Sequence, residues 1–350
     1  MRRLIILAAL LFPYAAAAQE SLTLSGVLRA GEPGEIPYQV IAPARWNGTF
    51  VVDLDFTTSW NPALRQWFLD EGYAIGGTRR LQNSHAYVIR EYVENFLTLR
   101  RLLTERSGTA PKRTIAFGVS RGAIPARAAI EMHPDVFDGA VVFSGGGQAL
   151  VGLLNTKLDV SWTLKDVDYQ RLFERSSLRE LVRQQYRKAG LDLDADLERL
   201  ARAPRIAADP AAVAVAERHV GYTGRIKGPI LSVKTVGDPA DPPATDTAYS
   251  ETLRRAGTRD LLRNVYINRP GHATMTVGER IAGFQALIDR LASGRWADEA
   301  ELPAALNALT ERLDRDSPLE LGPPAFVRFT APQALRTWDF SNWGTYKPPR

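Results

Sequence analysis

The sequence has 350 residues, of which 45% are hydrophobic and 24% charged, with a formal net charge of +5 and no cysteine. This composition is typical of a globular protein with a sizeable core and argues against a disordered chain. The lack of cysteine excludes disulfides, thiol catalysis and zinc–thiolate sites. Basic residues do not form runs interleaved with aromatic residues, so we expect no nucleic-acid partner.

The first 18 residues have the pattern of a secretory signal peptide. Arg2 and Arg3 precede a short apolar run over residues 4–11, and alanines at 15–18 supply the small residues that a signal peptidase prefers. The apolar run is shorter than the about 20 residues that cross a bilayer. We therefore expect cleavage near Ala18 and a periplasmic or secreted protein without a membrane span.

Strands and helices are expected to alternate along most of the remaining chain. Two antiparallel strands are predicted at 21–29 and 36–41, and a third, central strand at 50–54. The elements expected next are a helix at 62–71, a strand at 73–76, a helix at 87–106, a strand at 114–117, a helix at 123–132 and a strand at 139–143. Strands at 229–235 and 262–267 then alternate with helices at 246–256 and 277–291. This alternation predicts an α/β fold with a mostly parallel sheet flanked by helices.

Residues 147–225 interrupt this alternation. Their apolar spacing is helical, and Ser177 with Glu180 resembles a capping box at a helix start. We expect an all-helical cap here, inserted between two core segments at 19–146 and 226–295. The glycines at 145–147 indicate a flexible crossing into the cap. Residues 296–350, with a helix expected at 301–313, are predicted to form a C-terminal extension that packs on the core.

A glycine-flanked serine lies between the strand at 114–117 and the helix at 123–132. The pattern is Gly118-Val119-Ser120-Arg121-Gly122, a G-x-S-x-G motif in the strand–turn–helix setting where it carries chemistry. The turn is tight enough to strain the serine backbone, and side chains at either flanking position would clash, so both favour glycine. Ser120 is therefore a candidate nucleophile, held at a helix N-terminus that favours a developing oxyanion.

A nucleophilic serine needs a base and a carboxylate that orients the base. Of the four histidines, His272 follows the strand at 262–267, in a loop at the sheet edge where catalytic groups gather. His85, His133 and His219 are less well placed. Asp238 follows the strand at 229–235 and is the candidate acid, with Asp241 as the alternative.

The order Ser120, Asp238, His272 resembles that of the α/β-hydrolase superfamily, over about residues 50–291. The local patterns V-G-D-P and P-G-H are similar to those around the acid and base of secreted bacterial esterases of that family. The resemblance implies that the backbone N–H of Arg121 lines the oxyanion hole. A second donor, from Phe56 or Thr57, is expected in a stretch that lacks the family's commoner His-Gly motif. The sequence contains no H-E-x-x-H motif and no cluster of histidines and aspartates, so we expect neither a metal nor a cofactor.

We therefore expect an exported serine hydrolase that acts on small-molecule esters and is most similar to carboxylesterases. A peptidase or amidase on the same fold is the alternative, because the triad chemistry is shared. A non-catalytic binding protein with this fold is the third possibility. Trp60 and Trp162 are candidate substrate-binding residues, although such aromatic residues more often belong to the core.

Overall fold

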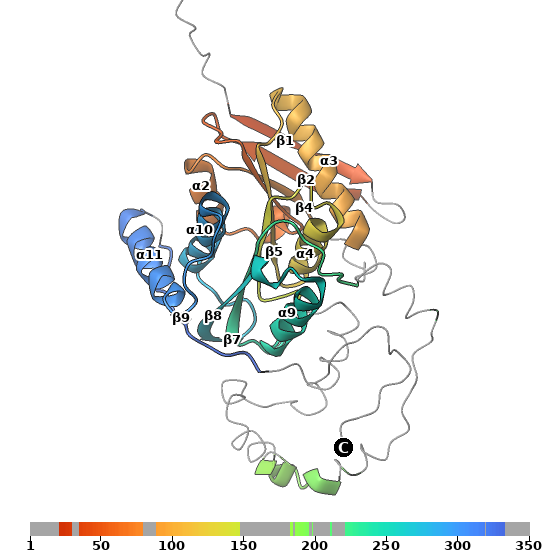
Figure 1. Ribbon diagram of the computed structural model, residues 1–350, viewed down its shortest axis with the longest axis vertical. Coiled ribbons are helices and arrows are strands. Elements are labelled where there is room, and N and C mark those ends of the chain that lie inside the picture. The colour runs from red at the N-terminus through yellow and green to blue at the C-terminus, as the bar shows by residue number, and fades with distance from the viewer. Residues whose placement is uncertain are drawn as a thin grey trace, which may run out of the picture.

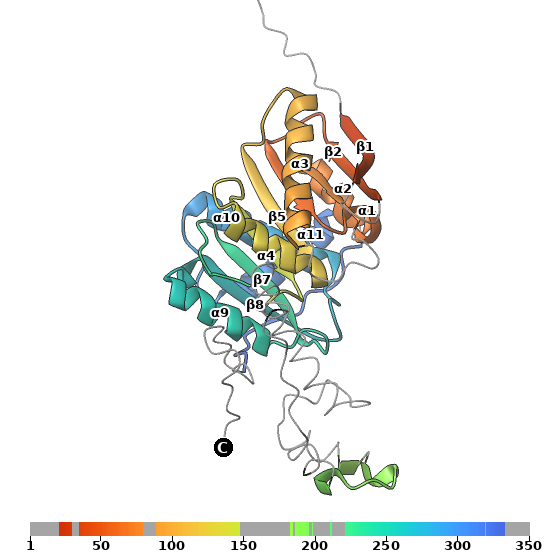
Figure 2. The ribbon, with the colours of Figure 1, turned by 90° about the vertical axis from the view of Figure 1, so that its right-hand side faces the viewer.

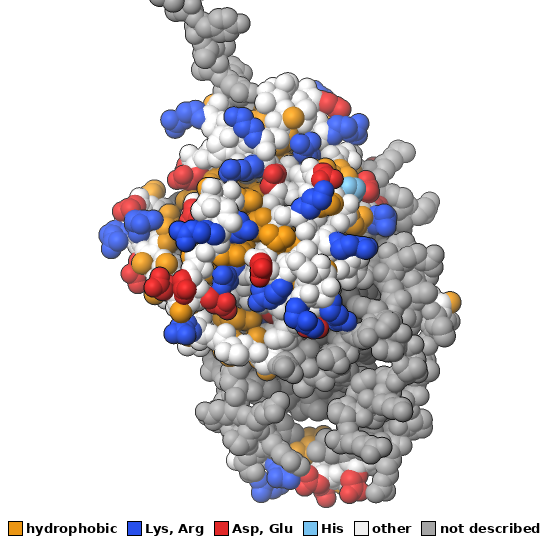
Figure 3. Space-filling view, in the orientation of Figure 1, with side chains coloured by type: hydrophobic (Ala, Val, Ile, Leu, Met, Phe, Trp, Pro, Cys, Tyr) orange, Lys and Arg blue, Asp and Glu red, His pale blue; other side chains and the backbone are white. Residues whose placement is uncertain are grey.

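The computed structural model describes residues 21–29, 35–79, 89–147, 183–184, 186–195, 198, 211, 221–318 and 320–332. The predicted signal peptide, most of the predicted cap, Trp162, His85 and His219 lie outside these residues, so the predictions for them are unchanged. Among the helices described, none is long and apolar enough to cross a membrane. On the face shown in Figure 3, basic and acidic side chains lie intermingled.

The described residues form one nine-stranded sheet in the order β1-β2-β4-β3-β5-β6-β7-β8-β9. Strands β4, β3, β5, β6, β7 and β8 run parallel, whereas β1, β2 and β9 pair antiparallel at the two edges. The predicted α/β fold with a mostly parallel sheet is therefore confirmed. The strands are β1 (Leu22–Arg29), β2 (Glu35–Ala42), β3 (Thr49–Asp53), β4 (Ala74–Thr78), β5 (Arg113–Val119), β6 (Gly139–Phe143), β7 (Ile230–Gly237), β8 (Leu262–Pro270) and β9 (Phe326–Val327).

Helices cover both faces of this sheet (Figure 1; Figure 2 turns the view by 90°). One face carries α3 (Ile89–Ser107), α4 (Ala123–Met132) and α9 (Ala244–Ala256), and the other carries α2 (Pro62–Asp70), α10 (Val277–Ser293) and α11 (Leu302–Asp316). A single turn, α1 (Phe56–Ser59), follows β3. Burial on both faces explains why the central strands read as nearly continuous apolar runs.

The core divides into two layers because successive strand side chains point to opposite faces. On β3, Phe50 and Val52 pack in the layer under α3 and α4, whereas Val51 packs in the layer under α2 and α10. All three side chains are fully buried. The β-branched and aromatic side chains of the central strands thus supply both layers.

The chain after residue 296 contributes to the second layer. Leu302 and Leu306 of α11 are buried in it, and Phe326 of β9 pairs with Ile267 on the edge of the sheet. The expected helix in this region is therefore present, within a few residues of the expected bounds. The two-residue strand β9 was not expected, because its length gives no alternating pattern.

Glu131, near the end of α4, binds the returning segment, residues 221–228, with which the described part of the chain resumes. The Glu131 carboxylate accepts hydrogen bonds from the Thr223 backbone N–H at 2.6 Å, the Thr223 hydroxyl at 2.9 Å and the Gly224 N–H at 3.1 Å. The Tyr249 hydroxyl of α9 donates to the same carboxylate at 3.2 Å. Burial raises the pKa of Glu131, although these donors oppose that effect.

Replacing Glu131 with alanine should lower the free energy of unfolding by about 2 kcal/mol, because several hydrogen-bond donors then lose their acceptor. Asp135 is the matched control, because its ion pair with Lys227 of the same returning segment is exposed to solvent. Asp135→Ala should cost less than about 1 kcal/mol. Urea unfolding of both variants measures the difference. Equal losses would contradict a specific role for the Glu131 clamp.

Candidate active site

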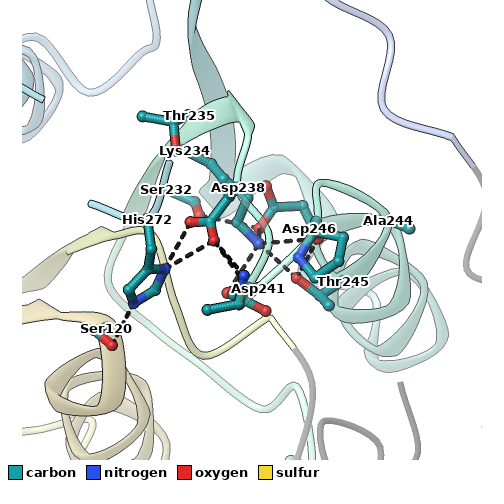
Figure 4. A network of polar contacts seen from close by, with 12 residues as sticks. Ser120, Ser232, Lys234, Thr235, Asp238, Asp241, Ala244, Thr245, Asp246 and His272 are labelled. Atoms are coloured by element: carbon teal, nitrogen blue, oxygen red, sulfur yellow. Dashed lines mark hydrogen bonds and ion pairs between the residues drawn. The ribbon is translucent and has the colours of Figure 1, made fainter. Parts of the chain in front are cut away.

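Ser120 lies in a strained turn at the carboxyl end of β5. Its φ is 55°, an uncommon value for a residue with a side chain. Ser120 opens a 3₁₀ turn that ends at Gly122, and α4 starts directly afterwards at Ala123. The turn places Ser120 at the start of α4 with its hydroxyl directed at His272, as Figure 4 shows.

Close backbone packing explains two of the glycines around this turn. A Cβ on Gly118 would overlap the backbone of Gly122, and a Cβ on Gly145 would overlap the Ser120 carbonyl. The glycine at 145 is thus required by close packing against the turn at Ser120, a role that the sequence did not indicate. A Cβ on Gly122 would instead lie 3.3 Å from a carboxylate oxygen of Asp55. Glycine is therefore less strictly required at the second flank.

His272 contacts Ser120 and Asp238 at the same time. Its Nε2 lies 2.6 Å from Ser120 Oγ, and its Nδ1 lies 2.8 Å and 3.0 Å from the two carboxylate oxygens of Asp238 (Figure 4). The Asp238 side chain is fully buried, whereas that of His272 is 28% exposed. The loops after β5, β7 and β8 thus bring together three residues separated by up to 152 positions.

The His272 loop is fastened to β7 on one side and to α10 on the other. The Thr235 hydroxyl donates to the Gly271 carbonyl at 2.7 Å, and the Gly271 N–H donates to the Gly237 carbonyl at 3.0 Å. On the other side, the Arg280 guanidinium donates to the carbonyl of Ala273 at 3.3 Å. Burial lowers the pKa of Arg280, but an arginine stays charged at any pH that the protein meets.

Asp238, rather than Asp241, is the carboxylate on His272. The Ala240 and Asp241 backbone N–H groups each donate to Asp238 Oδ1 at 2.9 Å, which orients the carboxylate toward the imidazole. The Asp241 side chain points away and forms an ion pair with Lys234 at 3.0 Å. Of the two acids left open by the sequence, the structure brings only Asp238 to the base.

The two predicted oxyanion donors lie in loops that are next to each other. Arg121 is the central residue of the 3₁₀ turn and its side chain is exposed, whereas Phe56 begins α1 and its side chain is fully buried. The loops are adjacent because Asp53, at the end of β3, pairs in register with Phe117 of β5. The roles of these two backbone N–H groups remain predictions.

Trp60 packs in the core between the β3 loop and α2. Its ring lies 5.0 Å from that of Phe117 and 5.2 Å from that of Phe68, and it is 8% exposed. The indole N–H donates to the buried Asp53 carboxylate at 2.5 Å. In the described residues, the surroundings of Trp60 are therefore those of a core residue that satisfies a buried carboxylate.

The variant Trp60→Phe should lower the free energy of unfolding by about 2 kcal/mol, because it removes a donor from the buried Asp53 carboxylate. Trp67→Phe is the control: Trp67 is equally exposed at 8% and packs on Phe68 and Tyr73, and its indole N–H has no hydrogen-bond partner within the part of the chain that the structure describes. Thermal unfolding compares the two. A larger loss for the control would contradict the importance of the Trp60 hydrogen bond.

His133 lies away from the other candidates. It caps the carboxyl end of α4, with Nε2 3.7 Å from a Glu94 carboxylate oxygen. A set of buried polar residues behind Asp238, among them Lys234 and Arg127, was not predicted from the sequence. The only available signal was a lysine in a strand expected to be buried, which simple alternation of polar and apolar residues also explains.

No model of a known protein family matches the chain. It is 28% identical over 212 residues to an o-phthalyl amidase of Xanthobacter agilis, an alignment that covers 58% of this chain and 45% of the amidase. The match thus spans less than half of that relative. In structure, the chain is similar to feruloyl esterase B from Aspergillus oryzae, with a TM-score of 0.56 and 11% identity over 79% of this chain and 81% of the esterase. Another esterase from the same organism matches with a TM-score of 0.53 and 11% identity, over 78% of this chain and 80% of that esterase.

Proposed function

The chain has the α/β-hydrolase fold, as the sequence resemblance implied, and on this fold we propose an exported serine hydrolase that cleaves carboxylic esters. The observation that supports this most is the unbroken contact from Ser120 Oγ through the His272 ring to the Asp238 carboxylate. Nucleophilic catalysis by serine requires such a series of contacts between nucleophile, base and acid on any fold.

In the proposed reaction, Ser120 Oγ attacks the ester carbonyl while His272 Nε2 takes the hydroxyl proton. Asp238 keeps the imidazole in the tautomer that can accept this proton and stabilises the imidazolium. The C–O bond to the leaving group then breaks, and His272 gives the proton to the departing alkoxide oxygen. A water molecule, deprotonated by His272, attacks the acyl-Ser120 ester. The acyl–Oγ bond then breaks, Ser120 Oγ takes the proton back from His272, and the carboxylic acid is released. The N–H groups of Arg121 and Phe56 would stabilise both tetrahedral intermediates.

An amidase is the second candidate, and the relative named o-phthalyl amidase favours it. The same three residues serve for both bonds, with the proton of His272 given to a leaving amine in place of an alkoxide. Because the alignment covers less than half of that relative, the amidase activity is only a candidate for this chain. Matched substrates separate the two proposals.

Export belongs to this proposal, on the basis of the pattern in residues 1–18. Expression of the full chain in a bacterium should yield a mature protein that begins near Gln19 in the periplasm or the medium. Amino-terminal sequencing of the recovered protein measures this. A protein that retains Met1 and stays in the cytoplasm contradicts export and leaves the hydrolase proposal intact.

A fluorophosphonate probe tests the serine chemistry directly. We expect the native protein to be labelled, with the adduct located on the Ser120 peptide by mass spectrometry and absent from Ser120→Ala. Unlabelled protein from the same preparation is then compared on ester and amide pairs with the same acyl group, including an o-phthalyl amide. Faster ester cleavage supports the first candidate, and faster amide cleavage the second. A folded protein that neither reacts with the probe nor turns over any pair contradicts both.

A further inference from the structure

A cluster of buried charges lies directly behind the catalytic acid. On the face of β7 that points to α9, Ile230 joins the apolar layer, but the next two positions on that face are Ser232 and Lys234. Lys234 is completely buried. A lysine is almost never fully buried unless its charge is paired, so its partners determine its role.

The Lys234 ammonium is surrounded by groups of the loop that carries Asp238 and of the start of α9. Its Nζ lies 3.0 Å from an Asp241 carboxylate oxygen and 3.2 Å from one of Asp246. It also donates to the hydroxyl of Thr245 and, at 3.4 Å, to the carbonyl of Pro242. Figure 4 shows the ammonium enclosed between these groups and Asp238. The lysine therefore ties the loop from 238 to 243 to both β7 and α9.

A second cation completes the cluster from the α4 side. The fully buried Arg127 guanidinium lies 3.8 Å from Asp246 and donates to the Ser232 hydroxyl at 2.9 Å. The Ser232 hydroxyl in turn donates to Asp246 at 3.2 Å. The ring of Tyr249 covers the guanidinium at 4.3 Å from its centroid.

The cluster therefore holds three carboxylates and two cations. The carboxylates are Asp238, Asp241 and Asp246, and the cations are Lys234 and Arg127. Burial alone would lower the pKa of Lys234, but the three carboxylates outweigh it and raise that pKa, so the lysine is charged at neutral pH. One carboxylate charge is left over, and the imidazolium that His272 becomes during turnover balances it.

We propose that Lys234 is a positioning residue for the triad, which holds the Asp238 loop in register and sets the charge that His272 experiences. The proposal rests on the proposed serine hydrolase function and extends it. By holding Asp241 and Pro242, the lysine presents the Asp241 N–H to Asp238 at 2.9 Å. A catalytic group misplaced by about 1 Å can cost roughly 10²-fold in rate, so this support has a measurable effect on turnover.

The charge effect has a definite sign. Replacing Asp241 with asparagine keeps the backbone N–H but removes a negative charge from the cluster that includes Asp238, which makes the imidazolium of His272 less favourable. The acidic limb of the profile of kcat/KM against pH should then move to lower pH. Replacing Lys234 with methionine removes a positive charge and should move the limb to higher pH. The double variant removes one charge of each sign and should return the limb toward its native position.

Other titratable groups face this cluster and are left in place in every variant. They are Arg127 from α4, Tyr222, whose ring packs on that of Tyr249, Asp246 and Tyr249 from α9, and Tyr266 from β8, whose hydroxyl is hydrogen-bonded to Asp246. Glu131, also from α4, contacts Tyr249 rather than Lys234. Because these groups are common to all variants, the comparison isolates the two charges that are changed.

The experiment measures kcat, KM and the pH profile for the native protein, Lys234→Met, Asp241→Asn and the double variant. We expect Lys234→Met to lower kcat by about 10²-fold with KM changed less than about threefold, and each single variant to move the acidic limb by about half a pH unit, in opposite directions. The rate of fluorophosphonate labelling against pH gives the same limb without a substrate. If Lys234→Met does not fold, the Asp241→Asn variant tests the charge effect: a limb that moves to lower pH supports it, and a limb that stays or moves to higher pH contradicts it.

Two controls separate positioning from stability. Lys227→Met removes an exposed lysine just before β7, and Val233→Ala weakens the buried strand without changing any charge. Both should keep the native pH limb, although Val233→Ala lowers the melting temperature. If the native protein is active but the acidic limb moves in none of the charge variants, the proposed role of Lys234 is overturned and the hydrolase proposal stands. An inert native protein contradicts the proposed hydrolase function itself.

Discussion

Replacing Ser120 with alanine should lower kcat by roughly 10⁶-fold, and replacing His272 with alanine should cost about as much. The reason is that the two side chains act as one unit, with Nε2 2.6 Å from Oγ, so either loss removes the activated nucleophile. The double variant should therefore be no slower than either single variant. Asp238→Asn should cost less, about 10⁴-fold, because the serine and the base remain while the tautomer is wrong.

Single-turnover and steady-state hydrolysis of an activated ester measure these losses, and circular dichroism checks the fold. Ser293→Ala is the matched control, an exposed serine at the end of α10 whose removal should leave kcat unchanged. If the losses in Ser120→Ala and His272→Ala multiplied in the double variant, the two residues would be acting independently. That outcome would contradict the proposed triad even if both single variants were slow.

Elements with strong local signals were predictable from the sequence alone. The bounds of α4 and β6 agree with the prediction to the residue, since an alanine-rich run ends before Pro134 and an apolar β-branched run starts at Gly139. The antiparallel pairing of β1 and β2 was also expected and is observed. In such segments the periodicity, the propensity and the breakers all agree, and local reasoning suffices.

Features that depend on distant contacts were not predictable. The short strand β9 exists only because the edge of β8 is available to pair with it. Likewise, the choice between Asp238 and Asp241 could not be made from spacing, since both follow β7 within one turn of chain. What separates them is Lys234, which engages the second carboxylate and leaves the first for His272. Lys234 also pairs with Asp246, which lies on α9, and the sequence does not show that β7 and α9 bring these two residues together.

Replacing Gly118 with alanine should be far more damaging than the same change at Gly122, although the motif treats the two positions alike. A Cβ on Gly118 would meet the carbonyl oxygen of Gly122 and the backbone of Ala123, and neither can move without opening the turn. We expect a loss of about 3 kcal/mol in the free energy of unfolding. The turn that holds Ser120 at positive φ should open as well, so fluorophosphonate labelling should slow sharply.

At Gly122 the backbone is already helical, with φ −63°, and the nearest atoms are carboxylate oxygens of Asp55 at 3.3 Å and Asp53 at 3.4 Å. Side chains can shift by the few tenths of an ångström that an added methyl group needs, and alanine favours the helix that follows. Gly122→Ala should therefore change the stability by less than about 1 kcal/mol and keep most of the labelling rate. Urea unfolding and labelling of the pair measure this asymmetry. If both variants lost equal stability and labelling rate, close backbone packing at Gly118 would not be what shapes the turn at Ser120.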